Sequence, residues 1–120
     1  MSKTISELAL TDIQAEIRRI ADEQPDHIYE RDGRGCVYVD TDDAGNLVGS
    51  CIVGRALVNL GVDPDMLQFA TGVPAAANLL YDEGFSETRK INWIQDVQAI
   101  QDSRKTWGDA VRKADEEVSE

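Results

Sequence analysis

The sequence predicts an α+β fold that is mostly helical, with about five helices and a small β-hairpin after the first main helix. Apolar residues recur at helical spacing along most of the 120 residues. One stretch rich in β-branched and aromatic residues, Cys36–Val39, interrupts this pattern. Hydrophobic residues make up 42 % of the chain, which is enough for one core at this length. We therefore expect a single domain over residues 1–120, with a frayed tail at 116–120.

The first main helix is predicted to lie between Thr11 and Pro25. Thr11 and Gln14 have the spacing of a capping box, and Pro25 stops the helix. Its narrow apolar face consists of Ile13, Ile17, Ile20 and Ala21. The segment Ile5–Leu10 is expected to form a helical turn or two before this helix.

The β-hairpin is predicted from a strand, a turn and a short return strand. Cys36–Val39 has strand composition, and Asp40–Asn46 contains the Asp, Gly and Asn residues that form turns. Leu47 and Val48 then return as the second strand, and His27–Asp32 is expected to be extended. Because a two-stranded hairpin alone is marginal in water, it must pack on helices.

Three helices are predicted in the middle of the chain, each bounded by residues typical of helix ends. The first extends from an N-cap at Ser50 to a C-terminal glycine at Gly61. The second begins at Asp63-Pro64 and ends near Gly72. The third extends from Pro74 to Gly84.

A long helix, Ser86–Gln101, carries an unusually wide apolar arc. At about 100° per residue its apolar side chains cover roughly half the circumference. They are Ile91, Trp93, Ile94, Val97 and Ile100. This helix is therefore either the central core helix or one whose extra edge meets a partner. Thr106 and Asp109 then begin a last helix.

The candidate partner interface combines this arc with the last helix. It consists of Trp93, Val97, Ile100, Trp107 and Val111. Large aromatic side chains anchor many protein interfaces, and this chain has only two tryptophans. The width of the apolar arc alone motivates the assignment.

The charge of the chain excludes several classes of function. Twelve Lys and Arg residues stand against 23 Asp and Glu residues, giving a net charge of −11. General binding to nucleic acid or to an anionic membrane needs clustered basic residues, and here they occur in isolated pairs among carboxylates. Acidity favours solubility or a basic protein partner.

The two cysteines, Cys36 and Cys51, are interpreted as free thiols of a cytoplasmic protein. No apolar leader opens the sequence, and no apolar run approaches the length of a membrane span. A disulfide between the two cysteines stays open as the alternative for an oxidising compartment.

No metal or cofactor site is predicted. Asp40–Gly45 resembles the start of a calcium loop, but Ala44 and Cys51 occupy positions where that loop needs ligands. Two cysteines 15 residues apart and one distant histidine do not make a zinc site. Gly33-Arg34-Gly35 lacks the lysine of a phosphate-binding loop and is interpreted as a β-turn.

Cys51 is the best catalytic candidate, because the start of a helix lowers the pKa of a thiol. A nucleophile also needs a base, and nothing in the sequence places the only histidine, His27, beside it. Its apolar neighbours Ile52 and Val53 favour a small buried hydrophobe instead. We therefore predict no catalytic residue and no enzymatic activity.

Residues 68–80 also contain a pattern typical of a helix-turn-helix. Ala70–Pro74 resembles the turn of bacterial repressors, and Pro74–Glu83 would be the recognition helix. That helix contains neither Lys nor Arg, so DNA binding through it is disfavoured.

Two parts of the chain together carry a resemblance to a known group of proteins. The first comprises Gly35–Val39, Cys51–Leu57 and Leu60–Val62, and the second Gln98–Asp102 and Thr106–Val111. Over roughly residues 33–62 and 91–114, the chain resembles small proteins of actinobacteria and their phages, especially mycobacteriophages. The resemblance implies a phage accessory protein that binds and inhibits a host protein, or counters a defence system, in an actinobacterial cytoplasm. It implies no site residues.

The sequence thus predicts a non-enzymatic protein–protein interaction module without a cofactor. Its partner would be an unknown host protein, with a homodimer as a further possibility, and neither nucleic acid nor a membrane is expected. The alternative is an acidic anti-defence or DNA-mimic protein that occupies a basic nucleic-acid groove. A Cys51-dependent enzyme and a DNA-binding helix-turn-helix protein are weaker alternatives.

Overall fold

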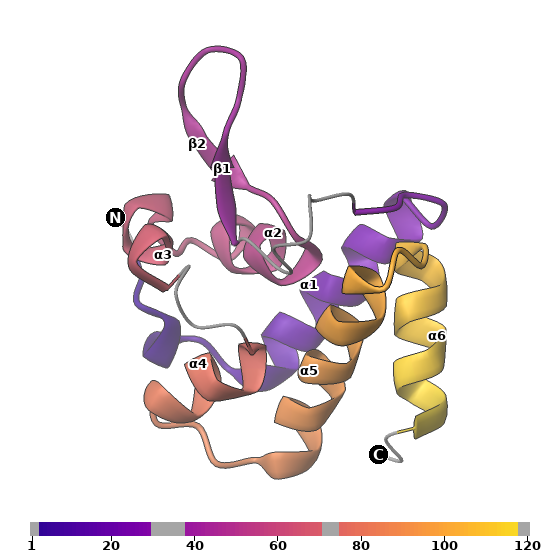
Figure 1. Cartoon of the computed structure of the whole chain (residues 1–120). Coiled ribbons are helices and arrows are strands. Elements are labelled where there is room, and N and C mark those ends of the chain that lie inside the picture. The colour runs from indigo at the N-terminus through magenta and orange to yellow at the C-terminus, as the bar shows by residue number, and fades with distance from the viewer. Residues whose placement is uncertain (1–2, 30–37, 71–74, 118–120) are drawn as a thin grey trace.

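Six α-helices and a two-stranded hairpin make up the described part of the computed structural model, residues 3–29, 38–70 and 75–117. In order, the elements are a 3₁₀ turn η1 (Ile5–Glu7), α1 (Leu10–Glu23), β1 (Val39–Thr41), β2 (Leu47–Gly49), α2 (Ile52–Asn59), α3 (Pro64–Ala70), α4 (Ala76–Asp82), α5 (Thr88–Asp102) and α6 (Trp107–Glu117). The predicted mostly helical α+β fold, with its hairpin after the first main helix, is confirmed (Figure 1).

The chain enters α1 through η1, and the helix starts earlier than predicted. The Thr4 amide donates to Glu7 Oε1 at 3.0 Å and fixes the 3₁₀ turn. Ala9 is the N-cap of α1, so the prediction of a cap at Thr11 is wrong. Thr11 lies in the first turn because the Ala9 carbonyl already accepts the amides of the first helical turn. The end before Pro25 is confirmed.

The hairpin pairs β1 and β2 antiparallel, with Val39 opposite Gly49. Its turn is the predicted acidic one: Asp42 Oδ1 accepts the amides of Ala44 and Asn46 at 3.0 and 2.9 Å. Of the predicted first strand, Val39 begins β1 and Tyr38 precedes it, while Cys36 and Val37 lie outside the described residues. The hairpin projects away from the packed helices (Figure 1).

The base of the hairpin rests on α2, and two glycines make this possible. A Cβ on Gly54 would lie 1.9 Å from the Tyr38 carbonyl oxygen. A Cβ on Gly49 would lie 2.6 Å from the Arg55 Cα. Both distances are below any real contact, so the hairpin and α2 approach closely only because both positions lack side chains.

The boundaries of the middle helices agree with the prediction to within a few residues. The N-cap of α2 is Cys51 and not Ser50, one residue later than predicted. Gly61 and Gly84 follow the ends of α2 and α4 with φ of 106° and 98°, as expected of C-terminal glycines. Residues 71–74, which contain the predicted helix-turn-helix turn and Pro74, lie outside the described residues.

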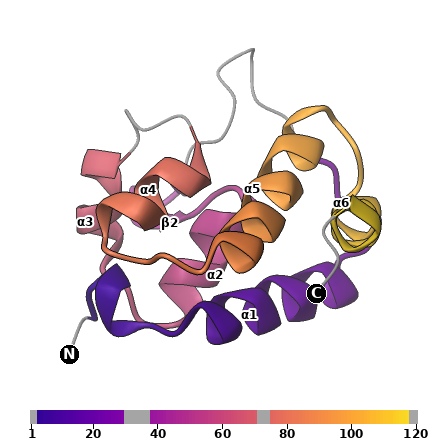
Figure 2. The same cartoon turned by 90° about the horizontal axis from the view of Figure 1, so that it is seen from below.

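The core is built around α5, which packs against α1, α2, α4 and α6. Figures 1 and 2 show α5 in the middle of this group. Four packed neighbours need apolar side chains on several sides of the helix, which explains its wide apolar arc. Within residues 3–29, 38–70 and 75–117, no helix is both long and apolar enough to cross a membrane.

Candidate functional site

Three of the five predicted interface residues lie in the core. Trp93, Val97 and Trp107 have no exposed surface. The structure therefore corrects the expectation that they face a partner: in the folded chain, helices of the same domain already cover them. Ile100 and Val111 are half-buried and pack against that core.

Trp93 closes the junction of α1, α5 and α6 with its polar edge. Its Nε1 donates to Asp115 Oδ1 at 2.8 Å. The same carboxylate accepts a bidentate pair of hydrogen bonds from Arg18, whose guanidinium lies 4.6 Å above the Trp93 ring. The Arg18 guanidinium lowers the pKa of Asp115, burial opposes this, and the Trp93 hydrogen bond lowers it further. Trp93 is thus a structural anchor.

Trp107 links α2, α5 and α6 in the same way. Its Nε1 donates to Gln101 Oε1 at 3.0 Å, and that oxygen also accepts the Ile52 amide at 3.2 Å. The centroid of the His27 ring lies 4.2 Å from that of Trp107, and the Cζ atom of Arg55 lies 5.0 Å from the Trp107 ring centroid. A single indole therefore holds the only histidine of the chain and a cation in fixed positions.

The geometry of Cys51 removes it as a nucleophile. Its side chain is fully buried, and it is disulfide-bonded. The prediction of a free thiol at this position is wrong, because a disulfide sulfur has no thiolate to attack with. The Sγ atom instead accepts the Gly54 amide at 3.4 Å and caps α2. The other cysteine, Cys36, lies outside the described residues.

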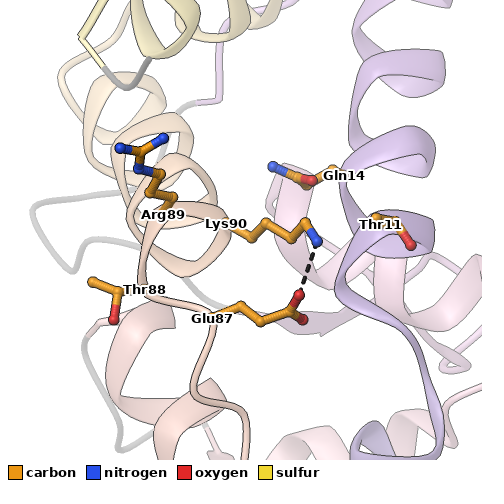
Figure 3. A pocket seen from close by; sticks show the side chains of 6 residues that line it. All are labelled: Thr11, Gln14, Glu87, Thr88, Arg89 and Lys90. Atoms are coloured by element: carbon orange, nitrogen blue, oxygen red, sulfur yellow. Dashed lines mark hydrogen bonds and ion pairs between the residues drawn. The ribbon is translucent and has the colours of Figure 1, made fainter. Parts of the chain in front are cut away.

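A cavity with a volume of about 560 Å³ lies between the N-terminal parts of α1 and α5. Thr11, Gln14, Glu87, Thr88, Arg89 and Lys90 line it. Figure 3 shows Lys90 and Glu87 extending toward α1, where they form an ion pair of 2.8 Å, while Arg89 points away from that pair. Among the described residues of this lining no nucleophile has a base beside it, and Glu87 neutralises Lys90.

Another cavity, with a volume of about 350 Å³, lies between β2 and α2. Leu47, Val48, Gly49, Arg55, Val58 and Asn59 line it. Its lining is mainly aliphatic with one cation, Arg55. This is the composition of many small-molecule sites, in which a few polar groups orient an apolar ligand.

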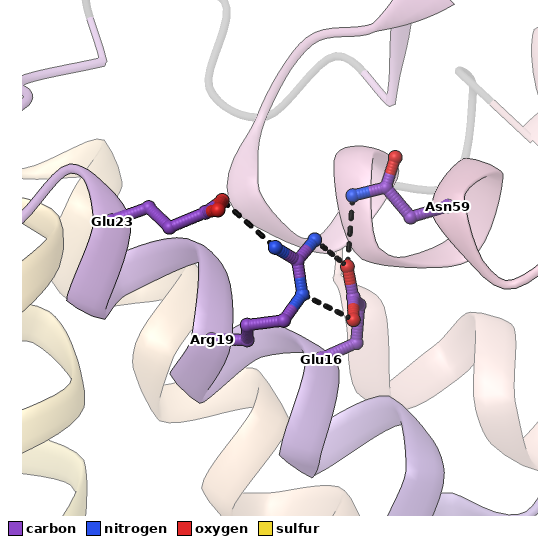
Figure 4. Close-up of polar contacts among 4 residues, drawn as sticks. All are labelled: Glu16, Arg19, Glu23 and Asn59. Carbon is purple, nitrogen blue, oxygen red and sulfur yellow. Dashed lines mark hydrogen bonds and ion pairs between the residues drawn. The ribbon is translucent and has the colours of Figure 1, made fainter.

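Beside this cavity, a polar cluster ties α1 to α2 (Figure 4). Glu16 accepts hydrogen bonds from Arg19 on its own helix and from Asn59 Nδ2 of α2 at 2.9 Å. Arg19 also pairs with Glu23 at 2.8 Å. The hydrogen bond from Arg19 lowers the pKa of Glu16. Burial raises this pKa, and the hydrogen bond from Asn59 lowers it further. Each charge here has a partner, so the cluster positions helices.

No group of three or more His, Cys, Asp or Glu side chains within the described ranges is arranged to hold a metal ion. No protein-family model, no curated protein and no solved structure matches the chain. Any functional assignment therefore rests on the chain's own surfaces and cavities.

Proposed function

We propose that this protein is a protein–protein interaction module whose partner is basic, and that the hairpin and the start of α3 form its binding surface. We call this region the acidic hairpin surface. It comprises Asp40, Asp42, Asp43 and Val48 of the hairpin and Asp63, Asp65 and Met66 at the start of α3. In keeping with the sequence resemblance, the partner is proposed to be a host protein met by a phage accessory protein.

The observation that carries the proposal is the charge of this part of the chain. Residues 38–70 contain five aspartates and a single basic residue, Arg55, while the other 11 of the 12 Lys and Arg residues lie elsewhere. The Arg55 guanidinium lies over the Trp107 ring of α6, and one cation does not balance five carboxylates. The field of the hairpin is therefore strongly negative and attracts a positively charged partner.

Exposed apolar side chains accompany these carboxylates. Val48 of β2 is 39 % exposed and Met66 of α3 is 44 % exposed, and α3 packs against both strands. Interfaces commonly combine apolar contact with a charged rim, and an adaptable Met is frequent at binding surfaces. In the described residues, β1 and β2 pair only with each other, so the outer edge of each strand is open.

A second copy of the chain fits this surface poorly. An isologous contact would bring hairpin aspartates against hairpin aspartates, and like charges at close range are repulsive. We therefore propose a heterologous, basic partner in preference to the homodimer.

The test is retention of proteins from an actinobacterial lysate by three tagged chains. The first is the wild type, the second carries D42N, D43N and D65N, and the third carries D12N, D22N and D82N. The two triple variants have the same net charge, but the third leaves the acidic hairpin surface intact. We expect a basic protein that the wild type and the third chain retain at low salt, and that the second chain loses.

Two outcomes would overturn the proposal. One is equal loss of the partner in both variants, which would mean that total charge alone matters. The other is equal retention by all three chains. If the retained protein binds nucleic acid and duplex DNA displaces it, the DNA-mimic alternative replaces the proposed role.

A further inference from the structure

A second feature of the molecule is the environment of Arg55, which shares only Val48 with the acidic hairpin surface. The arginines at the junctions of α1 have carboxylate partners: Arg18 pairs with Asp115, and Arg19 with Glu16 and Glu23. Within residues 3–29, 38–70 and 75–117, the Arg55 guanidinium has neither a hydrogen-bond acceptor nor an ion-pair partner. In a chain with 23 carboxylates, a half-buried guanidinium without an acceptor is exceptional.

The nitrogens of Arg55 differ in their access to solvent. Its Nε is buried without a partner, and it is the only such side-chain nitrogen or oxygen atom among the described residues. The Nη1 and Nη2 atoms are not among these buried atoms, so they are not completely shielded from solvent. The guanidinium therefore presents its two terminal nitrogens, the geometry that receives a carboxylate or phosphate in two parallel hydrogen bonds.

The orientation of this guanidinium is fixed before any ligand arrives. It lies over the Trp107 ring, and Gln101 holds the indole by accepting its Nε1 hydrogen. At the other end of the side chain, Gly49 of β2 packs against the backbone and Cγ of Arg55. Because packing already restricts the side chain, binding costs less conformational entropy than at a surface arginine.

No carboxylate among the described residues pairs with Arg55, and the charge of Arg55 reaches His27. His27 lies on the same indole, and burial together with the charge of Arg55 lowers its pKa. No carboxylate of the described residues contributes to this shift, and a nearby carboxylate would raise the pKa of His27. An anion that binds Arg55 would fill this gap.

The cavity that Arg55 lines provides room for the rest of a ligand. Its volume of about 350 Å³ is at the small end of the range for ligand sites. Leu47, Val48 and Val58 offer aliphatic contact. The Nδ2 group of Asn59 is already engaged by Glu16, so Arg55 is the one cationic anchor in the described lining.

We propose that this cavity is a small-molecule site for an amphiphilic anion, with the oxyanion of the ligand on the terminal nitrogens of Arg55 and its apolar body against Leu47, Val48 and Val58. The ligand class is a short carboxylate or phosphate ester with an aliphatic or aromatic portion. The inference does not rest on the proposed partner, because it uses the cavity between β2 and α2 and not the aspartates of the hairpin.

The first experiment titrates the full-length protein with octanoate and follows the methyl and imidazole signals by NMR. Acetate and octan-1-ol supply the anion and the apolar body separately, and inorganic phosphate tests the other oxyanion. We expect octanoate to shift the signals of Val48 and Val58 and to raise the measured pKa of His27. Acetate and octanol should bind at least about tenfold more weakly than octanoate.

Matched variants locate the anchor. Arg55→Gln should weaken octanoate binding at least about tenfold, because it removes charge-assisted hydrogen bonds. Arg89→Gln, which removes an exposed arginine near the other cavity, should leave the affinity unchanged. Arg55→Lys keeps the charge and an aliphatic side chain of similar length, and it should retain part of the affinity. It is the control for the case in which Arg55→Gln fails to fold.

Three results would overturn the proposal. The first is an absence of shifts at Val48 and Val58 in the wild type with octanoate and with phosphate. The second is octanoate affinity that is equal in the wild type and in a folded Arg55→Gln variant. The third is octanol binding as tightly as octanoate, which would mean that the cavity binds apolar molecules and that Arg55 contributes nothing to the affinity.

Discussion

The acidic hairpin surface and the tryptophan junction, where α5 and α6 meet α1 at Trp93 and α2 at Trp107, satisfy their polar groups in opposite ways. At the junction, the tryptophans are fully buried and each indole N–H has an acceptor, Asp115 or Gln101. On the hairpin, the exposed side chain of Asp42 accepts amides of its own turn. The junction is closed to partners, whereas the hairpin has charge and apolar groups to offer one.

This contrast separates the residues that stabilise the fold from those that we propose for binding. The aromatic residues that most resemble interface anchors in the sequence stabilise the fold. The parts that we propose for binding are the hairpin, whose strands pair only with each other among the described residues, and Arg55, whose guanidinium has no acceptor among them. The following variants separate stability from binding in these two regions.

The largest effect is expected for Trp107→Ala, which empties the junction of α2, α5 and α6. Loss of a fully buried Trp costs about 3–5 kcal/mol in free energy of unfolding. Urea denaturation followed by circular dichroism measures it. Tyr81→Ala, at a residue that is 44 % exposed, is the control and should change stability by no more than about 0.5 kcal/mol. Similar costs for both would contradict the assignment of Trp107 to the core.

The next effect tests the contact between the hairpin and α2. Gly54→Ala places a Cβ against the Tyr38 carbonyl oxygen, and we expect a loss of about 1–3 kcal/mol because the backbone must move. Thermal unfolding checks this against Gly84→Asn as a control. At Gly84 a Cβ would meet no atom within 4 Å, and Asn tolerates the positive φ there best among residues with a side chain. If the Gly54 variant is as stable as the wild type, the close approach is not present.

A smaller effect, dependent on pH, is expected at Asp115. The Arg18 hydrogen bonds lower its pKa, so the stabilising contribution is present above the ordinary Asp pKa of about 3.9 and is lost as pH falls through the lower pKa of the folded state. The pair is exposed, so the contribution is at most about 1 kcal/mol. Asp115→Asn should therefore destabilise the protein at pH 6 and match the wild type near pH 2. A difference in stability that persists at pH 2 would contradict this origin.

The smallest effect on stability is expected where binding should change most. The variant with D42N, D43N and D65N should unfold within about 0.5 kcal/mol of the wild type, since surface substitutions seldom cost more. In D42N the new side-chain amide retains an oxygen that can accept the amides of the turn. Urea denaturation of this variant and of D12N, D22N and D82N checks the point. A large loss in the first alone would mean that the aspartates stabilise the hairpin.

The order of the elements could be predicted from local signals in the sequence. Pro25 and the glycines at 61 and 84 end helices through their own backbone preferences, and the Asp and Gly residues of 42–46 form a turn with local hydrogen bonds. These signals act within a few residues, so they can be read without the fold. The cap positions were missed by one or two residues, because the first amides of α1 donate to the Ala9 carbonyl and the Gly54 amide of α2 donates to Cys51 Sγ, and neither residue is a typical cap.

The role of each apolar and charged side chain, by contrast, was settled by tertiary packing. The arc of α5 is equally wide for a core helix and for an interface helix, and it became core because four helices surround it. The sequence also contains no signal for the environment of Arg55, whose neighbours Trp107 and His27 lie 52 and 28 residues away. Burial and pairing depend on contacts between distant segments, and those contacts exist only after the chain has folded.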